Sequence, residues 1–152
     1  MNLATLKDPD PFFFSTITPV DYKIPMVSIL DIGTFLAEQL TDKSIVQEKL
    51  YVVELHGPQR YSPLDVRAAF TRALGKEVDL RPVAKDHLHQ FYAQIFPPTI
   101  LDYWVEMAMS ILPGGRLGSE YLLHRRVPVH NGRTNLETAI KASCEASFSS
   151  GA

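Results

Sequence analysis

The chain has 152 residues, 45% of them hydrophobic and 21% charged, which is the composition of one ordinary globular domain. Fifteen Lys and Arg residues against seventeen Asp and Glu residues give a formal net charge of −2, so the chain as a whole does not attract nucleic acid or an anionic membrane. The basic cluster His124–Arg126 is too short to change this expectation, and we interpret it as solvated loop.

Two strands and a helix are predicted at the start of the chain. Phe12–Ile17 is rich in β-forming residues and apolar on both faces, so we expect it to pack beneath another element. Ile24–Ser28 has the pattern of a short buried strand. Asp31 is placed to cap a helix from Ile32 to about Thr41. The apolar face of that helix comprises Ile32, Phe35, Leu36 and Leu40.

A strand and a clearly delimited helix follow. Leu50–Leu55 is almost continuously apolar and ends at the Gly57–Pro58 turn. Ser62, with Pro63 at the first helical position, opens a helix that Gly75 ends. The apolar side of this helix comprises Leu64, Val66, Ala69, Phe70, Ala73 and Leu74.

The next segment is predicted to contain one strand followed by two helices. Glu77–Val83 has the alternating pattern of a strand. A helix is expected over Asp86–Ile95, ended by the Pro97–Pro98 pair. A longer helix is expected over Thr99–Leu112, ended by Pro113–Gly115.

The last segment is predicted to be a loop followed by a helix. Arg116–His130 is interpreted as loop, with one short strand near Leu122. Thr134 and Glu137 have the spacing of a capping box, in which each side chain bonds to the other's backbone amide. The final helix would therefore cover Asn135–Ala146.

These elements predict a mixed α/β (α+β) fold with about five helices and four short strands. We expect a single domain over residues 1–147 and a flexible tail over residues 148–152. The single cysteine, Cys144, has no disulfide partner within the chain, which is typical of a reducing compartment. No signal peptide is expected, and the longest apolar stretch, Ile100–Leu112, is shorter than the about 20 residues of a membrane span. The expected location is cytoplasmic.

Six short runs of residues carry a resemblance to a known family. They are Ile24–Ser28, Asp31–Gly33, Tyr51–Leu55, Gly57–Pro58, Tyr61–Pro63 and Gly132–Thr138. In order and spacing they resemble the second half of the NmrA-like group, atypical relatives of the short-chain dehydrogenases. The resemblance implies that the predicted strands before Ser62 are the last two strands of a Rossmann-like sheet, and that the helices after it form a small domain over a substrate cleft. The N-terminal glycine-rich half of that group would be missing.

No motif for a dinucleotide cofactor is recognised. A Rossmann fingerprint needs Gly-x-Gly-x-x-Gly between a strand and a helix, whereas Gly114–Gly118 follows a helix and opens none. The Tyr-x-x-x-Lys pair of short-chain dehydrogenases is also missing, since Tyr22 and Lys23 are adjacent. We therefore expect no cofactor-binding residue and no cofactor of its own, with NADP bound only if another chain supplies a Rossmann half.

The two strands of the expected sheet remnant would have exposed edges. Either strands of a second copy pair with them, or Phe12–Ile17 covers them. We favour a homodimer, formed through the sheet edge or the Phe-rich segment Phe12–Phe14. Ordinary core packing explains the three phenylalanines equally well.

Three residues are candidates for acid–base catalysis. His87 is a candidate base because an imidazole titrates near neutral pH, and a surface histidine is the alternative. Asp102 and Glu106 are four apart on one helix face, which either meets solvent or faces the cleft as a carboxylate pair. His87 and His89 are two apart on a predicted helix and point in different directions, so no metal site is expected.

An aromatic and methionine-rich set of residues is the candidate substrate pocket. Such side chains bind flat or apolar small molecules, although core or dimer contacts would use the same residues. The candidates are Phe14, Tyr22, Tyr92, Phe96, Tyr103, Trp104 and Met107. No nucleophile motif is present, because there is no Gly-x-Ser-x-Gly and Cys144 has no histidine near it in sequence.

Three functions remain open. The preferred one is a small-molecule-binding protein, expected to be a cofactor-independent enzyme that isomerises, cyclises or dehydrates an apolar or aromatic metabolite in the remnant cleft. The second is a fragment or subunit of an NAD(P)-dependent oxidoreductase. The third is a non-catalytic regulatory or interaction module.

Overall fold

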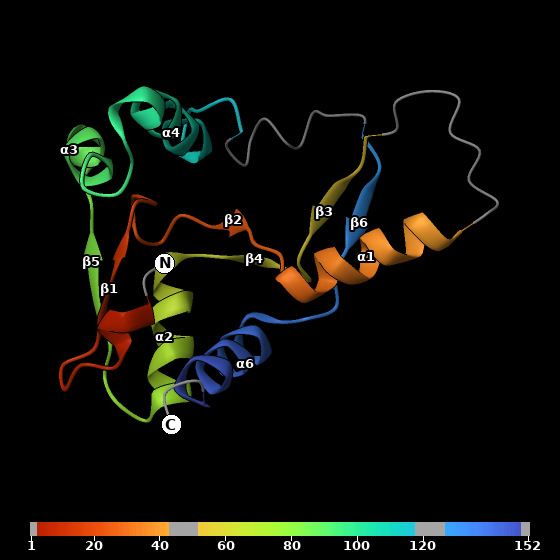
Figure 1. Cartoon of the computed structure of the whole chain (residues 1–152), viewed down its shortest axis with the longest axis horizontal. Coiled ribbons are helices and arrows are strands. Elements are labelled where there is room, and N and C mark those ends of the chain that lie inside the picture. The colour runs from red at the N-terminus through yellow and green to blue at the C-terminus, as the bar shows by residue number, and fades with distance from the viewer. Residues whose placement is uncertain (1–2, 43–51, 118–126, 150–152) are drawn as a thin grey trace.

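The computed structural model of the chain describes residues 3–42, 52–117 and 127–149. These residues form a mixed α/β fold of five α-helices and six short strands, which confirms the predicted class (Figure 1). In chain order the elements are η1 (Leu3–Leu6), β1 (Phe12–Ser15), β2 (Ile24–Pro25), α1 (Ile29–Thr41), β3 (Glu54–His56), β4 (Arg60–Tyr61), α2 (Pro63–Leu74), β5 (Asp79–Pro82), η2 (Lys85–His87), α3 (Leu88–Tyr92), α4 (Pro98–Ile111), β6 (Val129–Asn131) and α6 (Leu136–Ser149). Within the described residues, no helix has the length and apolar character needed to cross a membrane.

The strands are arranged as three separate pairs. β1 and β5 are parallel, β2 and β4 are antiparallel, and β3 and β6 are parallel. The two expected Rossmann-like strands, β2 and β3, therefore lie in different pairs. The idea that Phe12–Ile17 covers their edges is wrong, because β1 pairs with β5. The partner of β3 is β6, which begins at Val129 in a segment that the sequence predicted as loop. The strand expected near Leu122 lies outside the described residues.

The main core lies between η1, β1, α2 and α6, and α2 and α6 run side by side (Figure 1). Its buried members are Leu6, Phe13, Val66, Ala69, Phe70, Val78, Ile140 and Cys144. Helix α2 begins after Ser62 and ends at Gly75, as the local sequence predicted. The Oγ of Ser62 accepts the Asp65 N–H at 3.2 Å, the Asp65 carboxylate accepts the Ser62 N–H at 2.8 Å, and Gly75 ends the helix with φ of 64°. The Ser62 bonds lower the pKa of Asp65.

A second, smaller core joins α3 to α4. Its buried residues are Val83, Leu88, Ala108 and Leu112. The helix predicted over Asp86–Ile95 is in fact η2 followed by a five-residue α3, and neither element has a side-chain cap bond. α4 agrees with its prediction to within a residue at each end, because proline begins it and Pro113 follows Leu112.

The capping predictions for α1 and α6 are both wrong, for one shared reason. Ser28, not Asp31, caps α1, and its Oγ accepts the Leu30 N–H at 3.3 Å. The Asp31 carboxylate instead accepts the N–H and the hydroxyl of Thr134 at 2.9 and 2.8 Å. These bonds lower the pKa of Asp31. With Thr134 engaged there, Asn135 caps α6 by accepting the Thr138 N–H at 2.9 Å.

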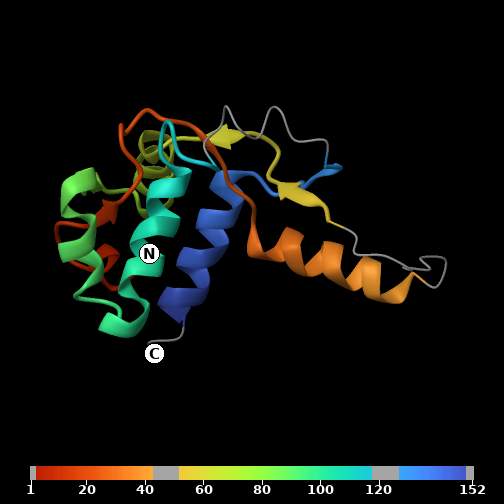
Figure 2. The same ribbon diagram turned by 90° about the horizontal axis from the view of Figure 1, so that it is seen from above.

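Helix α1 lies beside the β3–β6 pair and extends away from α2 and α6 (Figures 1 and 2). Only part of the predicted apolar face of α1 packs against other residues. Ile32 and Phe35 are half-buried, and the Phe35 ring lies 4.8 Å from that of His130. No residue of α1 is buried, and the exposed fractions of Ile29 and Leu40 are 84% and 86%.

Candidate functional site

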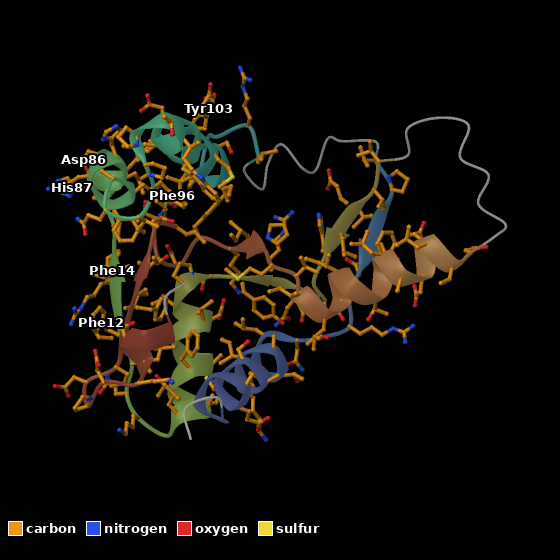
Figure 3. All side chains as sticks on the ribbon, in the orientation of Figure 1. Phe12, Phe14, Asp86, His87, Phe96 and Tyr103 are labelled. Atoms are coloured by element: carbon orange, nitrogen blue, oxygen red, sulfur yellow. The ribbon has the colours of Figure 1, made fainter. Side chains whose placement is uncertain are left out.

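The three predicted catalytic residues do not form one site. His87 is exposed, with its Nε2 3.9 Å from the Asp86 carboxylate on the outer side of α3 (Figure 3). Asp102 is exposed on α4 and pairs with Nε2 of His89 at 3.4 Å. Glu106 is exposed one turn further along α4. Among the described residues, no group of three or more potential ligands is arranged to hold a metal ion.

Four of the predicted substrate-binding residues lie in one run of contacting rings. The centroids of Phe14 and Phe91 are 5.5 Å apart, those of Phe91 and Tyr92 5.4 Å, and those of Tyr92 and Phe96 5.8 Å. Phe96 then stacks on Trp104 at 4.4 Å with an interplanar angle of 5°. The run joins β1 to α3 and α4, and Phe91 and Tyr92 pack on the second core. These rings therefore hold the elements together.

The remaining predicted substrate-binding residues lie apart from this run. Tyr103 projects from α4 on the side away from Phe96 (Figure 3), and Met107 is exposed on the next turn. Tyr22 is half-buried in the turn before β2, where its N–H donates to the Pro19 carbonyl at 3.0 Å. The structure thus assembles Phe14, Tyr92, Phe96 and Trp104 but leaves Tyr22, Tyr103 and Met107 outside.

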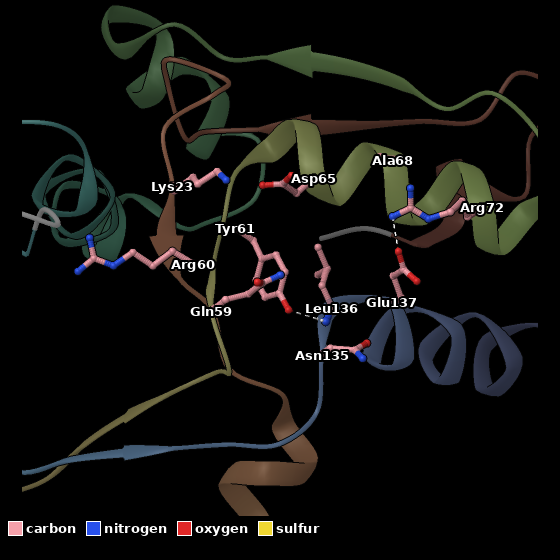
Figure 4. A pocket seen from close by; sticks show the side chains of 10 residues that line it. All are labelled: Lys23, Gln59, Arg60, Tyr61, Asp65, Ala68, Arg72, Asn135, Leu136 and Glu137. Atoms are coloured by element: carbon pink, nitrogen blue, oxygen red, sulfur yellow. Dashed lines mark hydrogen bonds and ion pairs between the residues drawn. The ribbon is translucent and has the colours of Figure 1, made fainter.

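A polar pocket of about 370 Å³ lies between β4, one side of α2 and the first turn of α6 (Figure 4). It is lined by Lys23, Gln59, Arg60, Tyr61, Asp65, Ala68, Arg72, Asn135, Leu136 and Glu137. Three of its charged groups have partners within it or at its edge: Arg72 forms an ion pair with Glu137, and Asp65 bonds to Ser62. The Arg60 side chain extends away from α2 and α6 (Figure 4). The Tyr61 hydroxyl accepts the Leu136 N–H at 3.1 Å. This pocket is a hydrogen-bonded seam that ties β4 to α6.

An apolar cleft of about 290 Å³ lies between the strands β2 and β3 and the end of α4. It is lined by Ile24, Pro25, Glu54, Leu55, His56, Ile111 and Leu117. Within it, Nε2 of His56 lies 3.2 Å from the Glu54 carboxylate. The exposed fractions of these two side chains are only 23% and 12%. A histidine held by a carboxylate beside an apolar surface is an arrangement suited to proton transfer.

Strand geometry puts Glu54 and His56 together. Residues two apart on a strand point to the same face, and β3 includes both. Pairing with β6 fixes the strand, because the His56 carbonyl accepts the Gly132 N–H at 2.6 Å and the Glu54 N–H donates to the Pro128 carbonyl at 2.9 Å. The pair was not predicted from the sequence, because the predicted strand ended at Leu55 and so excluded His56. The Glu-x-His spacing was the signal available to find it.

The family-like runs border these cavities. Tyr61–Pro63 and Gly132–Thr138 meet at the polar seam, and the end of Tyr51–Leu55 lines the apolar cleft. The cleft lies between the strands and a helix that follows Ser62, where the resemblance implies a substrate site. The NmrA-like resemblance remains a prediction, because no family model, curated protein or solved structure matches the chain.

Proposed function

We propose that this chain is an NmrA-like protein that binds an apolar small molecule in the cleft between β2, β3 and α4, and acts on it by proton transfer without a dinucleotide. The observation that supports this is the half-buried Glu54–His56 pair at 3.2 Å, on a wall that otherwise includes Ile24, Ile111 and Leu117. The apolar wall suits an apolar or aromatic metabolite.

The roles of the two residues follow from their contact. The Glu54 carboxylate lies 3.2 Å from Nε2 of His56 and fixes the orientation of the imidazole ring. Nδ1 is then the nitrogen that exchanges a proton with the bound molecule. Taking a proton from the carbon beside a carbonyl and returning it at another position is an isomerisation, and the electron count of the substrate does not change. Cyclisation and dehydration use the same proton transfers and remain alternatives.

A hydrogen–deuterium exchange experiment tests this function. The probe is 2-tetralone, a bicyclic aromatic ketone, in D₂O, with loss of the proton signals beside its carbonyl followed by NMR. We expect the protein to accelerate the exchange. In His56→Gln the protein-catalysed exchange rate is expected to fall about 100-fold, which is within the usual range of a general-base contribution. His87→Gln is the matched control and is expected to exchange like the wild type.

Two results would contradict the proposal. The first is no acceleration of exchange by the folded wild-type protein. The second is loss of exchange in His87→Gln with retention in His56→Gln, which would place the base in η2. Thermal unfolding with NADP, NAD and 2-tetralone runs in parallel, and stabilisation by NADP alone would favour the oxidoreductase-subunit alternative.

A second candidate function, the interaction module, is supported by α1. Ile29, Leu36 and Leu40 are spaced by seven and four residues, so they share one face, and all three are exposed. The β3–β6 pair beside α1 is only two strands wide within the described residues, and such a pair is marginal alone. A second copy of the chain, placed across a two-fold axis, would cover both.

Light scattering tests this homodimer. We expect the wild-type protein to be a dimer and the double variant Leu36→Lys/Leu40→Lys to be a monomer, because two charges cannot be buried in an apolar helix contact. Glu38→Lys, on the polar side of the same helix, is the matched control and keeps the dimer. A monomeric wild type, or a dimeric double variant, would remove α1 as the interface.

A further inference from the structure

A third cavity, beside the last turn of α2 and the middle of α6, differs in its chemistry from the two described above. It has a volume of about 740 Å³ and lies between η1, the last turn of α2 and the middle of α6. Its lining consists of Leu6, Lys7, Ala73, Leu74, Lys76, Lys141, Cys144 and Glu145. It shares no residue with the seam or with the apolar cleft.

The floor of this cavity is the outer side of the main core. Leu6 and Cys144 are buried members of that core, and the partly buried Leu74 packs against it. Burial raises the pKa of the Cys144 thiol, so this group is a neutral apolar surface at physiological pH. An apolar group laid on the floor would leave water at little cost, since no polar side chain beneath it loses a partner.

The rim of the cavity is cationic. Lys7, Lys76 and Lys141 surround it with a single acid, Glu145, in a chain whose net charge is −2. Lys76 and Lys141 are exposed, and within the described ranges neither forms an ion pair. Lysine stems extend along apolar surface while their ammonium groups remain in water, where they act as point charges for an anion.

We propose that this cavity binds an amphipathic organic anion: an acyl chain or aromatic body that carries one carboxylate. The apolar body lies on Leu6, Leu74 and Cys144, and the carboxylate pairs with Lys76 and Lys141. A sugar phosphate would cover the apolar floor with polar groups, and a neutral hydrocarbon would leave the lysines unused. The proposal concerns a second site and does not depend on the proton-transfer function of the cleft.

The single cysteine makes this site directly measurable. Cys144 is the only thiol in the chain, so the rate of its alkylation by iodoacetamide, followed by intact-protein mass spectrometry at mildly alkaline pH, reports on this floor alone. We expect decanoate to slow alkylation in a saturable way, and decanol, which has the same chain length without the charge, to act only at much higher concentration. The double variant Lys76→Ala/Lys141→Ala is expected to need about tenfold more decanoate for half-protection.

Two variants distinguish a ligand bound in this cavity from a ligand that slows Cys144 alkylation by stabilising the fold from another site. Lys85→Ala removes an exposed lysine remote from the cavity and is expected to behave like the wild type. Ala73→Trp, at an exposed position of α2 that lines the cavity, fills it without touching the core and is expected to lose the protection. The proposal would be overturned if decanoate left the alkylation rate of Cys144 unchanged, or if decanol slowed alkylation at the same concentration as decanoate. It would also be overturned if decanoate protected Cys144 in Ala73→Trp or in the double lysine variant as well as it does in the wild type.

Discussion

Replacing Phe13 by alanine is expected to destabilise the protein by about 4 kcal/mol, a large share of the stability of a small domain. The exposed fraction of Phe13 is 2%, and its ring centroid lies 5.7 Å from that of Phe70 in the main core. Removing the ring leaves a cavity between β1 and α2, and the parallel pairing of β1 with β5 limits how far the strand can move to fill it.

Phe14→Ala is the matched control for this change. Phe14 is the next residue on the same strand, but its exposed fraction is 47%. It lies at the end of the aromatic run, where its ring contacts those of Phe12 and Phe91. The expected loss is about 1 kcal/mol. Urea unfolding followed by circular dichroism measures both variants. Similar losses for Phe13 and Phe14 would contradict the placement of β1, and a small loss for Phe13 would mean that the Phe-rich segment is not part of the core.

Replacing Gly57 by alanine is expected to destabilise the protein by about 3 kcal/mol, because a side chain here meets backbone. Gly57 is buried directly after β3, and a Cβ atom built on it would lie 2.0 Å from the Met26 carbonyl oxygen. Neither segment can yield as a flexible side chain would. The change would also displace His56, so we expect Gly57→Ala to reduce the hydrogen–deuterium exchange activity together with the stability.

Gly33→Ala is the matched control, with the opposite expected sign. Gly33 lies in the middle of α1, where a Cβ atom would meet nothing within 4 Å. Alanine there is expected to stabilise the protein by about 0.5–1 kcal/mol, because it restricts the unfolded chain and favours the helix. Thermal unfolding should give a midpoint about 10 °C lower for Gly57→Ala and about 2 °C higher for Gly33→Ala. Equal shifts of the unfolding midpoint in the two variants would show that Gly57 does not lie against the Met26 backbone.

The placement of the two histidines changes which chemistry the chain supports. The sequence favoured His87, whose side chain is 68% exposed and lies beside Asp86 on the surface. His56 is held by a partly buried carboxylate and lines a cleft. The difference arises because acid–base catalysis depends on the surroundings of a side chain. The apolar surroundings of His56 come from β2 and the end of α4, which are remote from His56 in sequence.

The sequence alone determined the features that depend on neighbouring residues. The α/β class follows from the spacing of apolar residues, and the bounds of α2 follow from Ser62, Pro63 and Gly75. The bounds of α4 follow in the same way from the prolines on either side of it. A cap or a proline acts on the backbone within about one turn, so no distant contact is needed to predict its effect.

The tertiary structure alone decided which segments meet. Asp31 and Thr134 are 103 residues apart, and their hydrogen bonds overrode both predicted caps, since each side chain has a limited number of bonds to give. The pairing of β3 with β6 was equally invisible, because β6 is three exposed residues with no apolar pattern. The cleft with the Glu54–His56 pair exists only because β2, β3 and the end of α4 come together from remote parts of the chain. The Glu-x-His spacing is a local signal, but neighbouring residues carry no record of contacts between remote segments, so the cleft around the pair had to come from the fold.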